Sequence, residues 1–283
     1  MTRSISGSIL LFLTGVTLVS GQTFEAASVK PHDSAAPGRS GPQGGPDTSD
    51  PTRFLCRNCS LRNLLMTAYD IKGYQLSSET RSERYDVQAK VPEGISRAQF
   101  RVMLRNLLAE RFRLASHRRS KQMPAYLLIV GRNRPKIKLS QARRPLPEDD
   151  GLPAPADKDG FPDPAPGSGI YIFADAHNIY RLGARNISMQ RFADRLSTVT
   201  SRPVYDATGL DGEYDIKLLW VPDLPGAARR AQDGSILPAD SYDDSRPTLQ
   251  QALEKQLGLR LESSNGQVDV LVIDHAEKVP TAN

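Results

Sequence analysis

A set of short sequence blocks that occurs twice is the feature that most constrains how this chain can fold. Six blocks recur in the same order, and the offset between the two copies changes only where loops intervene. The paired blocks are 58–65 and 186–193, 84–87 and 213–216, 91–92 and 221–222, 103–108 and 252–257, 112–114 and 259–261, and 127–129 and 271–273. Self-similarity of this kind is typical of a repeated structural unit. The sequence therefore predicts a tandem duplication of one small unit.

Each copy has the pattern of a unit that mixes helices and strands. Ser60 and Ser188 are placed to cap helices, because a serine side chain can accept the unpaired amides of a first helical turn. Apolar residues then follow at helical spacing, and each copy continues with an alternating strand, a second helix and two further strands. The order strand, helix, strand, helix, strand, strand predicts an α+β fold.

The last two strands of each copy are expected to form a hairpin. In the first copy these strands are 111–117 and 125–130, and in the second copy they are 259–263 and 268–273. Asn265-Gly266 lies between the second pair, and this dipeptide is typical of a two-residue hairpin turn.

Three segments have a composition that does not favour a packed core. Residues 32–52, 140–169 and 223–247 are rich in Pro, Gly, Asp and Ala, and we expect them to be disordered or weakly ordered. The expected organisation is a signal peptide (1–21), an N-terminal strand and disordered segment (22–52), repeat unit 1 (53–139), a Pro-rich linker (140–169) and repeat unit 2 (170–283) with a disordered insertion (223–247).

The N-terminus has the pattern of a secretory signal peptide. A basic start at Arg3 precedes an apolar stretch over residues 9–19, and small residues follow at Ser20 and Gly21. Cleavage near Gly21/Gln22 would export the mature chain to the periplasm or beyond, where a disulfide can persist. An uncleaved anchor helix is the alternative. No later stretch is apolar for long enough to cross a membrane, so we expect no transmembrane span in the mature chain.

Basic residues are concentrated in the middle of the chain. From Arg97 to Arg144 there are 14 Lys and Arg residues and one acid, Glu110, whereas the C-terminal half is acidic. A basic surface of this kind can bind phosphate or sulfate groups, or it can pair with acidic residues of the same molecule. The candidate anion-binding residues are Arg97, Arg101, Arg105, Arg111, Arg113, Arg118, Arg119 and Lys121.

Two cysteines, Cys56 and Cys59, lie just before the first expected helix. A thiolate at a helix start is stabilised by the helix dipole, which leaves redox chemistry open, as it does free thiols. A structural disulfide is the favoured interpretation, because the second copy has Ala184 and Ile187 at the equivalent positions and the unit therefore does not require the pair.

Few other residues suggest chemistry. His117 lies in a basic run, and Asp274-His275 follows the last strand, but no nucleophile motif accompanies them. Asp86 and Asp215 recur at equivalent strand positions, where a carboxylate that accepts nearby backbone amides is expected to be structural. The histidines have no metal-ligand spacing and no phosphate-binding or dinucleotide-binding motif occurs, so the sequence predicts no metal, no cofactor and no catalytic residue.

Several segments together resemble a known family. They are 24–31, 84–90, 103–117, 202–210 and 254–277. The chain is similar to a large family of uncharacterised exported proteins that is expanded in soil acidobacteria of the Solibacter type. Related domains are found as extracellular extensions of membrane metallopeptidases of the β-lactam-sensor kind, which implies a sensing or binding role. Each expected unit also resembles the N-terminal modules of secretins and TonB-dependent receptors, which contact partners in the periplasm.

The function expected from the sequence is therefore an exported, non-enzymatic binding or sensing module. Its partner would be another component of the cell envelope, either a protein or an anionic polymer or lipid. Exposed aromatic residues for base stacking are few in the basic segment, so sequence-specific binding of nucleic acid is not expected. The alternative is an exported enzyme, either a hydrolase that uses His117 or His275 or a thiol oxidoreductase that uses Cys56 and Cys59.

Overall fold

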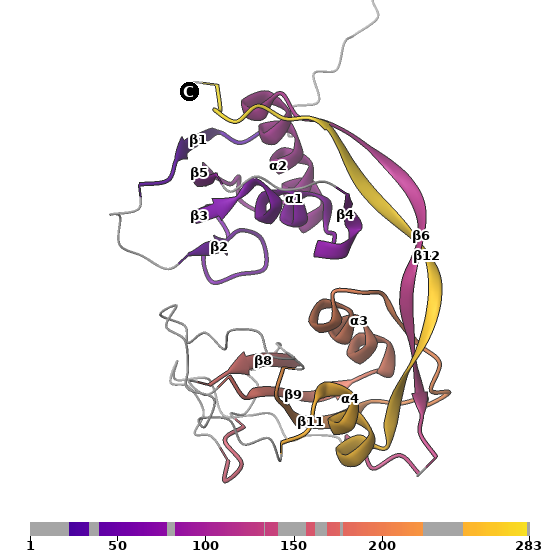
Figure 1. Cartoon of the computed structure of the whole chain (residues 1–283). Helices are drawn as coiled ribbons and strands as arrows, with labels where there is room; N and C mark the ends of the chain where they lie inside the picture. Colours follow the sequence, from indigo (N-terminus) through magenta and orange to yellow (C-terminus); the bar gives the residue numbers. More distant parts are fainter. Residues whose placement is uncertain are drawn as a thin grey trace, which may run out of the picture. The chain divides into compact units, whose positions relative to one another are not determined.

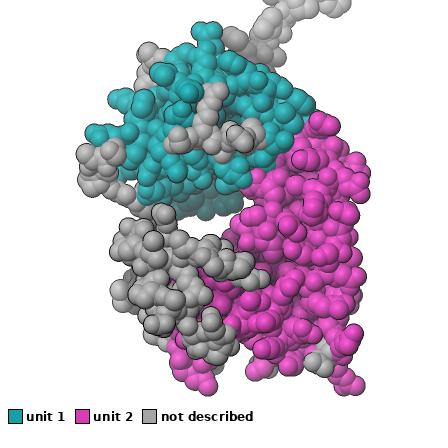
Figure 2. Space-filling view, viewed as in Figure 1, with its two compact units in different colours: residues 1–71, 76–118, 271–283 teal, residues 72–75, 119–270 magenta. Residues whose placement is uncertain are grey.

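The computed structural model describes most of the chain after the expected signal peptide. The described residues are 23–33, 40–77, 83–132, 134–140, 157–161, 169–175, 178–222 and 246–281. The expected signal peptide, most of the Pro-rich linker and nearly all of the expected 223–247 insertion lie outside them. The chain forms two compact units, and it passes between them more than once (Figure 2). Unit 1 comprises 1–71, 76–118 and 271–283, and unit 2 comprises 72–75 and 119–270.

Unit 1 is a four-stranded antiparallel sheet with two helices on one face (Figure 1). Its sheet has the order β1-β5-β3-β2. Its elements are β1 (Ala26–Pro31), β2 (Gly41–Gly44), β3 (Arg53–Ser60), α1 (Leu61–Tyr69), β4 (Leu76–Ser77), β5 (Arg84–Lys90) and α2 (Arg97–Phe112). Alternate residues of β5, Tyr85, Val87 and Ala89, are buried against the helices, as the period of a half-buried strand requires.

Unit 2 has a second four-stranded sheet, with the order β7-β11-β9-β8, and again the helices cover one face (Figure 1). Its elements are η1 (Gly73–Gln75), β7 (Lys138–Leu139), β8 (Ile170–Ala174), β9 (Tyr180–Ile187), α3 (Met189–Thr200), β10 (Val204–Asp206), β11 (Tyr214–Trp220), α4 (Leu249–Ala252) and the π-helical turn η3 (Leu253–Leu257). Phe192 of α3 is completely buried in the core of this unit. Both units thus have the α+β architecture expected from the sequence.

The helix starts agree with the sequence. Ser60 Oγ accepts the Asn63 amide at 3.2 Å, and Ser188 Oγ accepts the Arg191 amide at 3.3 Å, so both expected caps are present. The second helix expected in the first copy is present as α2, which begins at Arg97 after the N-cap Ser96 and ends at Phe112.

The same irregularity interrupts the central strands of both units. Asn58 in β3 and Asn186 in β9 have left-handed backbone conformations, with φ of 51° and 52°. In unit 1, Asp86 Oδ1 accepts the amide of Asn58 at 2.9 Å, and in unit 2, Asp215 Oδ1 accepts the amide of Asn186 at 3.1 Å. The structural role expected for the two aspartates is therefore confirmed. We call this feature the Asp–Asn bulge.

The prediction that each copy ends in a hairpin is wrong. Residues 115–130 form one continuous strand, β6, and residues 259–275 form another, β12, and these strands are neighbours in a third sheet of order β10-β6-β12-β4. Asn265-Gly266 therefore lies inside a strand and makes no turn. Gly266 has a different role: a Cβ at this position would lie 2.6 Å from the Tyr205 hydroxyl, so only glycine leaves room for that ring.

Each unit contains a part of both long strands. Residues 115–118 of β6 and 271–275 of β12 belong to unit 1, and the remaining residues of both strands belong to unit 2.

Residues Gly41–Gly44 also differ from the prediction. The sequence analysis expected them to be disordered or weakly ordered, but they form the edge strand β2 by pairing with β3.

Candidate functional site

The arginines of α2 and its C-terminus, expected to bind anions, largely have partners within unit 1. Arg97 Nε lies 2.9 Å from Asp47 Oδ2, Arg101 Nη2 lies 2.8 Å from Asp70 Oδ1, and Arg113 Nε lies 3.2 Å from Glu277 Oε1. The pairs are at least partly exposed, so each contributes little to stability. In each pair, however, a carboxylate already occupies the guanidinium with which an anionic ligand would have to interact.

The remaining five basic residues have different surroundings from one another. Arg105 lies over the Tyr69 ring at 5.6 Å, and the Arg111 side chain is only 14% exposed beside Glu110. Three further residues, Arg118, Arg119 and Lys121, are exposed along β6, and Arg118 is assigned to unit 1 while the other two are assigned to unit 2.

Cys56 and Cys59 form a disulfide across the Asp–Asn bulge of β3. Their Cα atoms are 5.8 Å apart, and both side chains are completely buried. The register of unit 2 places Ala184 and Ile187 at the matching positions, opposite Ile216 and Tyr214. In unit 2 the Asp–Asn bulge therefore forms without a disulfide.

His117 pairs with the carboxylate of Asp274, a partner that the sequence analysis did not predict. His117 Nδ1 lies 2.9 Å from Asp274 Oδ2, and both side chains are about half exposed. Asp274 thus pairs with a histidine on the neighbouring strand, whereas His275 follows it on its own strand.

A cavity that the sequence analysis did not predict lies in unit 2, beside the sheet of β7, β8, β9 and β11 and the turn η3. Its volume is about 410 Å³. The lining side chains come from β7, β8, β9 and β11, from the turn at 157–161 and from the segments at Lys136 and Gln256. Alternation along β11 leaves Asp215 and Lys217 exposed at this cavity, whereas Ile216, which also lines it, and Leu218 are buried in the core. We call this cavity the cationic cavity.

Four basic side chains and one carboxylate line the cationic cavity. The bases are Lys136, Lys138, Arg185 and Lys217, and the acid is Asp215, which gives a formal charge of +4 − 1 = +3. The Asp215 carboxylate already accepts the hydroxyl of Ser140 and the amide of Asn186, so its negative charge is engaged by the Asp–Asn bulge.

Two aromatic rings accompany these charges. Lys217 Nζ lies 5.6 Å from the centroid of the Phe161 ring and is paired with Asp157. The hydrogen bond from Lys217, with a second from the Phe161 amide, lowers the pKa of the Asp157 carboxyl. The Tyr171 ring lies across Gly183, where a Cβ would overlap it, so glycine at 183 is what allows the ring to lie against the sheet.

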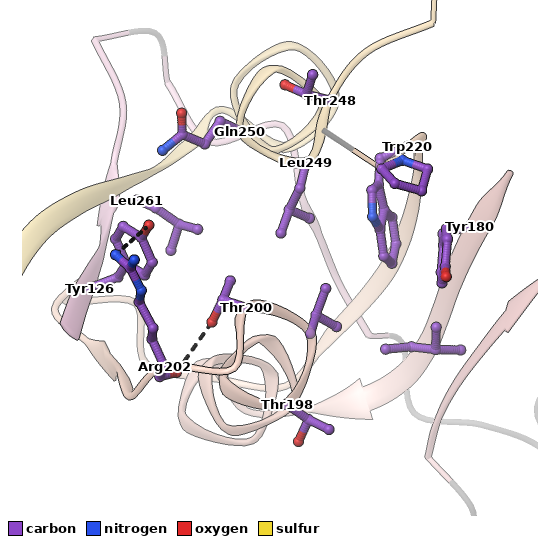
Figure 3. Close-up of a pocket in the computed structure, with 13 residues that line it drawn as sticks. Tyr126, Tyr180, Thr198, Thr200, Arg202, Trp220, Thr248, Leu249, Gln250 and Leu261 are labelled. Carbon is purple, nitrogen blue, oxygen red and sulfur yellow. Dashed lines mark hydrogen bonds between the residues drawn. The ribbon is translucent and has the colours of Figure 1, made fainter. Parts of the chain in front are cut away.

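A larger cavity, of about 670 Å³, lies within unit 2 beside α3 and α4 (Figure 3). Its walls include Tyr126, Tyr180, Arg202, Trp220 and Leu249. We call it the aromatic cavity. Its described residues come from seven separate segments of the chain, and no pattern in the sequence predicts that they meet.

Two general properties of the described residues bear on function. No group of three or more His, Cys, Asp or Glu side chains that could hold a metal ion occurs among them. None of their helices has both the length and the apolar character needed to cross a bilayer.

The fold and these cavities define an α+β protein of two units, each an open-faced sheet covered by helices on one side. The chain belongs to the family described as Protein of unknown function (DUF3738), which matches residues 62–276. The match begins at the second residue of α1 and ends after β12, so it includes all four α-helices and both cavities. The resemblance to an uncharacterised domain family is thereby confirmed. No curated protein and no solved structure matches the chain.

Proposed function

We propose that this chain is an exported, non-catalytic binding module that holds an anionic polymer of the cell envelope at the cationic cavity of unit 2. The observation that carries this proposal is the excess of four basic side chains over one engaged carboxylate in a single concave site. The proposal moves anion recognition from the α2 arginines, each of which pairs with a carboxylate, to one cavity of unit 2 whose lining has more basic side chains than carboxylates.

The chemistry of the cationic cavity fits an acidic polysaccharide. Lysine and arginine side chains can donate charge-assisted hydrogen bonds to carboxylate, sulfate or phosphate groups along such a polymer. The rings of Tyr171 and Phe161 provide flat apolar surfaces, against which the CH groups of a sugar ring can pack. The cavity is open to solvent on one side, as binding of a long chain by one or two of its sugars requires.

Export and duplication are part of the same proposal. The basic, apolar and small-residue pattern of the first 21 residues supports removal of a signal peptide. A tandem duplication is supported by the sheet orders β1-β5-β3-β2 and β7-β11-β9-β8, each with the Asp–Asn bulge directly before a serine-capped helix. A relationship to the periplasmic modules of secretins and TonB-dependent receptors stays a prediction from the sequence.

The mature chain, residues 22–283, provides a direct test with fluorescein-labelled polygalacturonate as the probe and fluorescence anisotropy as the readout. Binding should weaken between about 50 and 200 mM salt, because the contacts are ionic. Lys138→Gln should weaken binding about two- to fivefold, which is the range of one exposed charge pair. Asp157→Asn should strengthen binding, because it releases Lys217 while its amide oxygen can still accept the turn amides.

Lys121→Gln is the matched control, since Lys121 is an exposed lysine of the basic segment that does not line the cationic cavity. Unchanged binding in this variant is expected. If Lys121→Gln weakens binding as much as Lys138→Gln does, the effect is one of total charge and the proposed site is wrong. Absence of salt-sensitive binding to polygalacturonate and to dextran sulfate would remove the proposed function itself.

An exported hydrolase is a second candidate, favoured only by the pair of His117 and Asp274. A carboxylate that orients an imidazole at Nδ1 leaves Nε2 available as a general base. Hydrolysis of a panel of nitrophenyl esters and glycosides by the mature chain, lost in His117→Gln, would support this candidate. Activity unchanged in the variant would exclude His117 as its base.

A further inference from the structure

We propose that the aromatic cavity is a second binding site, which takes a small organic anion with a flat or apolar body. This site is separate from the cationic cavity and goes beyond the proposed function, because its lining residues differ entirely from those that would hold the polymer. The argument depends on the single charge in the cavity, on its two kinds of wall and on its volume.

Among the described residues that line the aromatic cavity, Arg202 is the only one whose side chain carries a charge at neutral pH. The other described residues around the cavity are apolar, aromatic, hydroxyl or amide in character, and no carboxylate is among them. No described carboxylate forms a salt bridge with Arg202. Among the described residues, Arg202 differs in this respect from Arg97, Arg101 and Arg113, each of which pairs with a described carboxylate.

Neighbouring groups hold Arg202 in place at the cavity. Its Nη1 donates a hydrogen bond to the Tyr126 hydroxyl at 3.3 Å, and the guanidinium lies 5.6 Å from the centroid of the Tyr126 ring (Figure 3). Thr200 Oγ1 donates to the Arg202 carbonyl at 3.2 Å, just after the end of α3. The Tyr126 hydroxyl oxygen accepts one of the five guanidinium N–H groups. The hydrogen of the same hydroxyl can therefore still be donated to a ligand. Two kinds of donor can therefore converge on one anionic group.

The opposite side of the aromatic cavity is apolar. Trp220 and Tyr180 stack with ring centroids 5.4 Å apart, and both lie across the cavity from Arg202 (Figure 3). Leu249 projects between these two sides, and Leu261 and Val199 add further apolar surface. A ligand that bridges the cavity would place its charge at Arg202 and its flat or apolar part against the Trp220 side.

The volume sets the size of the ligand. About 670 Å³ is within the range of small-molecule sites. The class that fits is an aromatic or short aliphatic carboxylate, sulfonate or phosphate. A polyanion is disfavoured, because a single guanidinium would leave its other charges without partners.

Trp220 makes the test specific to this cavity, because it is the only tryptophan in the chain. The probes are 4-bromobenzoate and its neutral analogue 4-bromobenzamide, whose heavy atom quenches nearby indole fluorescence on excitation at the tryptophan edge. For the mature chain we expect saturable quenching by 4-bromobenzoate, with 4-bromobenzamide binding about tenfold more weakly, as expected for one charge-assisted contact. In Arg202→Gln the two probes should bind equally.

Three further variants make the result decisive. Leu249→Tyr should fill the cavity and remove saturable quenching by both probes. Arg191→Gln, at an exposed arginine of α3 that does not line the aromatic cavity, should change nothing, and neither should Lys138→Gln in the cationic cavity. Equal binding of the two probes to the wild-type chain, quenching that never saturates, or a charge preference that survives Arg202→Gln would each overturn the proposal. Loss of polygalacturonate binding with these quenching results intact would instead remove only the proposed function.

Discussion

Removal of the Cys56–Cys59 disulfide should lower the stability of unit 1 without changing its fold. The bond closes a loop of four residues, 56–59, around the Asp–Asn bulge. For a loop of this length, the loss of chain entropy in the unfolded state corresponds to about 2 kcal/mol. A loss of this size in a unit of this length corresponds to a fall in Tm of roughly 5 to 10 °C.

The double variant Cys56→Ala/Cys59→Ile introduces the residues that unit 2 has at the matching positions, Ala184 and Ile187. We expect it to fold, because the bulge of unit 2 forms with those residues. Cys56→Ala/Cys59→Ala is the companion variant, in case the larger isoleucine overpacks the buried site of Cys59, which can itself cost about 1 to 3 kcal/mol.

The assay is thermal unfolding of the mature chain by circular dichroism, with and without reductant. Reductant should lower the Tm of the wild-type chain by the amount given above and leave both variants unchanged. A wild-type Tm that does not respond to complete reduction would refute the structural role of the disulfide. It would also favour the thiol oxidoreductase, in which oxidised and reduced forms must both be stable.

Three other changes test the core, the bulge and one pKa. Phe192→Ala should lower the free energy of unfolding by about 3 to 5 kcal/mol in urea titrations, because a fully buried ring leaves a cavity; a loss below about 1 kcal/mol would contradict the described core. Asp215→Ala should cost about 1 kcal/mol because the Asn186 amide and the Ser140 hydroxyl both lose the carboxylate as an acceptor, and Asp215→Asn should cost less. The pKa of the Asp157 carboxyl is lowered in the folded chain. The ionised carboxylate therefore stabilises the 157–161 turn above the unfolded pKa, and this stabilisation is lost as the pH falls through the lowered pKa. An NMR titration of the Lys217 resonances at acidic pH should show a midpoint below the ordinary aspartate pKa, and a midpoint at the ordinary value would contradict this prediction.

The local elements of the fold could be predicted from the sequence because their causes are local. Ser60 and Ser188 mark helix starts through hydrogen bonds to residues three positions ahead, and apolar spacing marks the buried faces. The Asn265-Gly266 dipeptide shows the limit of this reasoning. Its preference for a turn is weaker than the pairing available along β12, and the glycine is required for a different reason, the Tyr205 ring.

The sites were less accessible to sequence reasoning than the elements. The high charge of residues 97–144 was evident, but its partners at Asp47, Asp70 and Glu277 are far away in sequence. Likewise, alternation along β11 places Lys217 on an exposed face, but only tertiary structure brings Lys136 and Arg185 to the same cavity. Counting charges predicts the presence of cations, whereas their availability depends on packing.

The Asp–Asn bulge shows how one local frame can give two different surroundings. In unit 1, the carboxylate of Asp86 is shared between the Asn58 amide and His32, whose Nδ1 lies 2.8 Å away, and a disulfide lies beneath the bulge. In unit 2, Asp215 at the matching position lines the cationic cavity and is engaged by Ser140. The strand order and the bulge are the same, so the difference arises from the segments that pack around them. We therefore expect that exchange of Ser140 or Lys138 would alter the proposed binding while leaving the sheet of unit 2 intact.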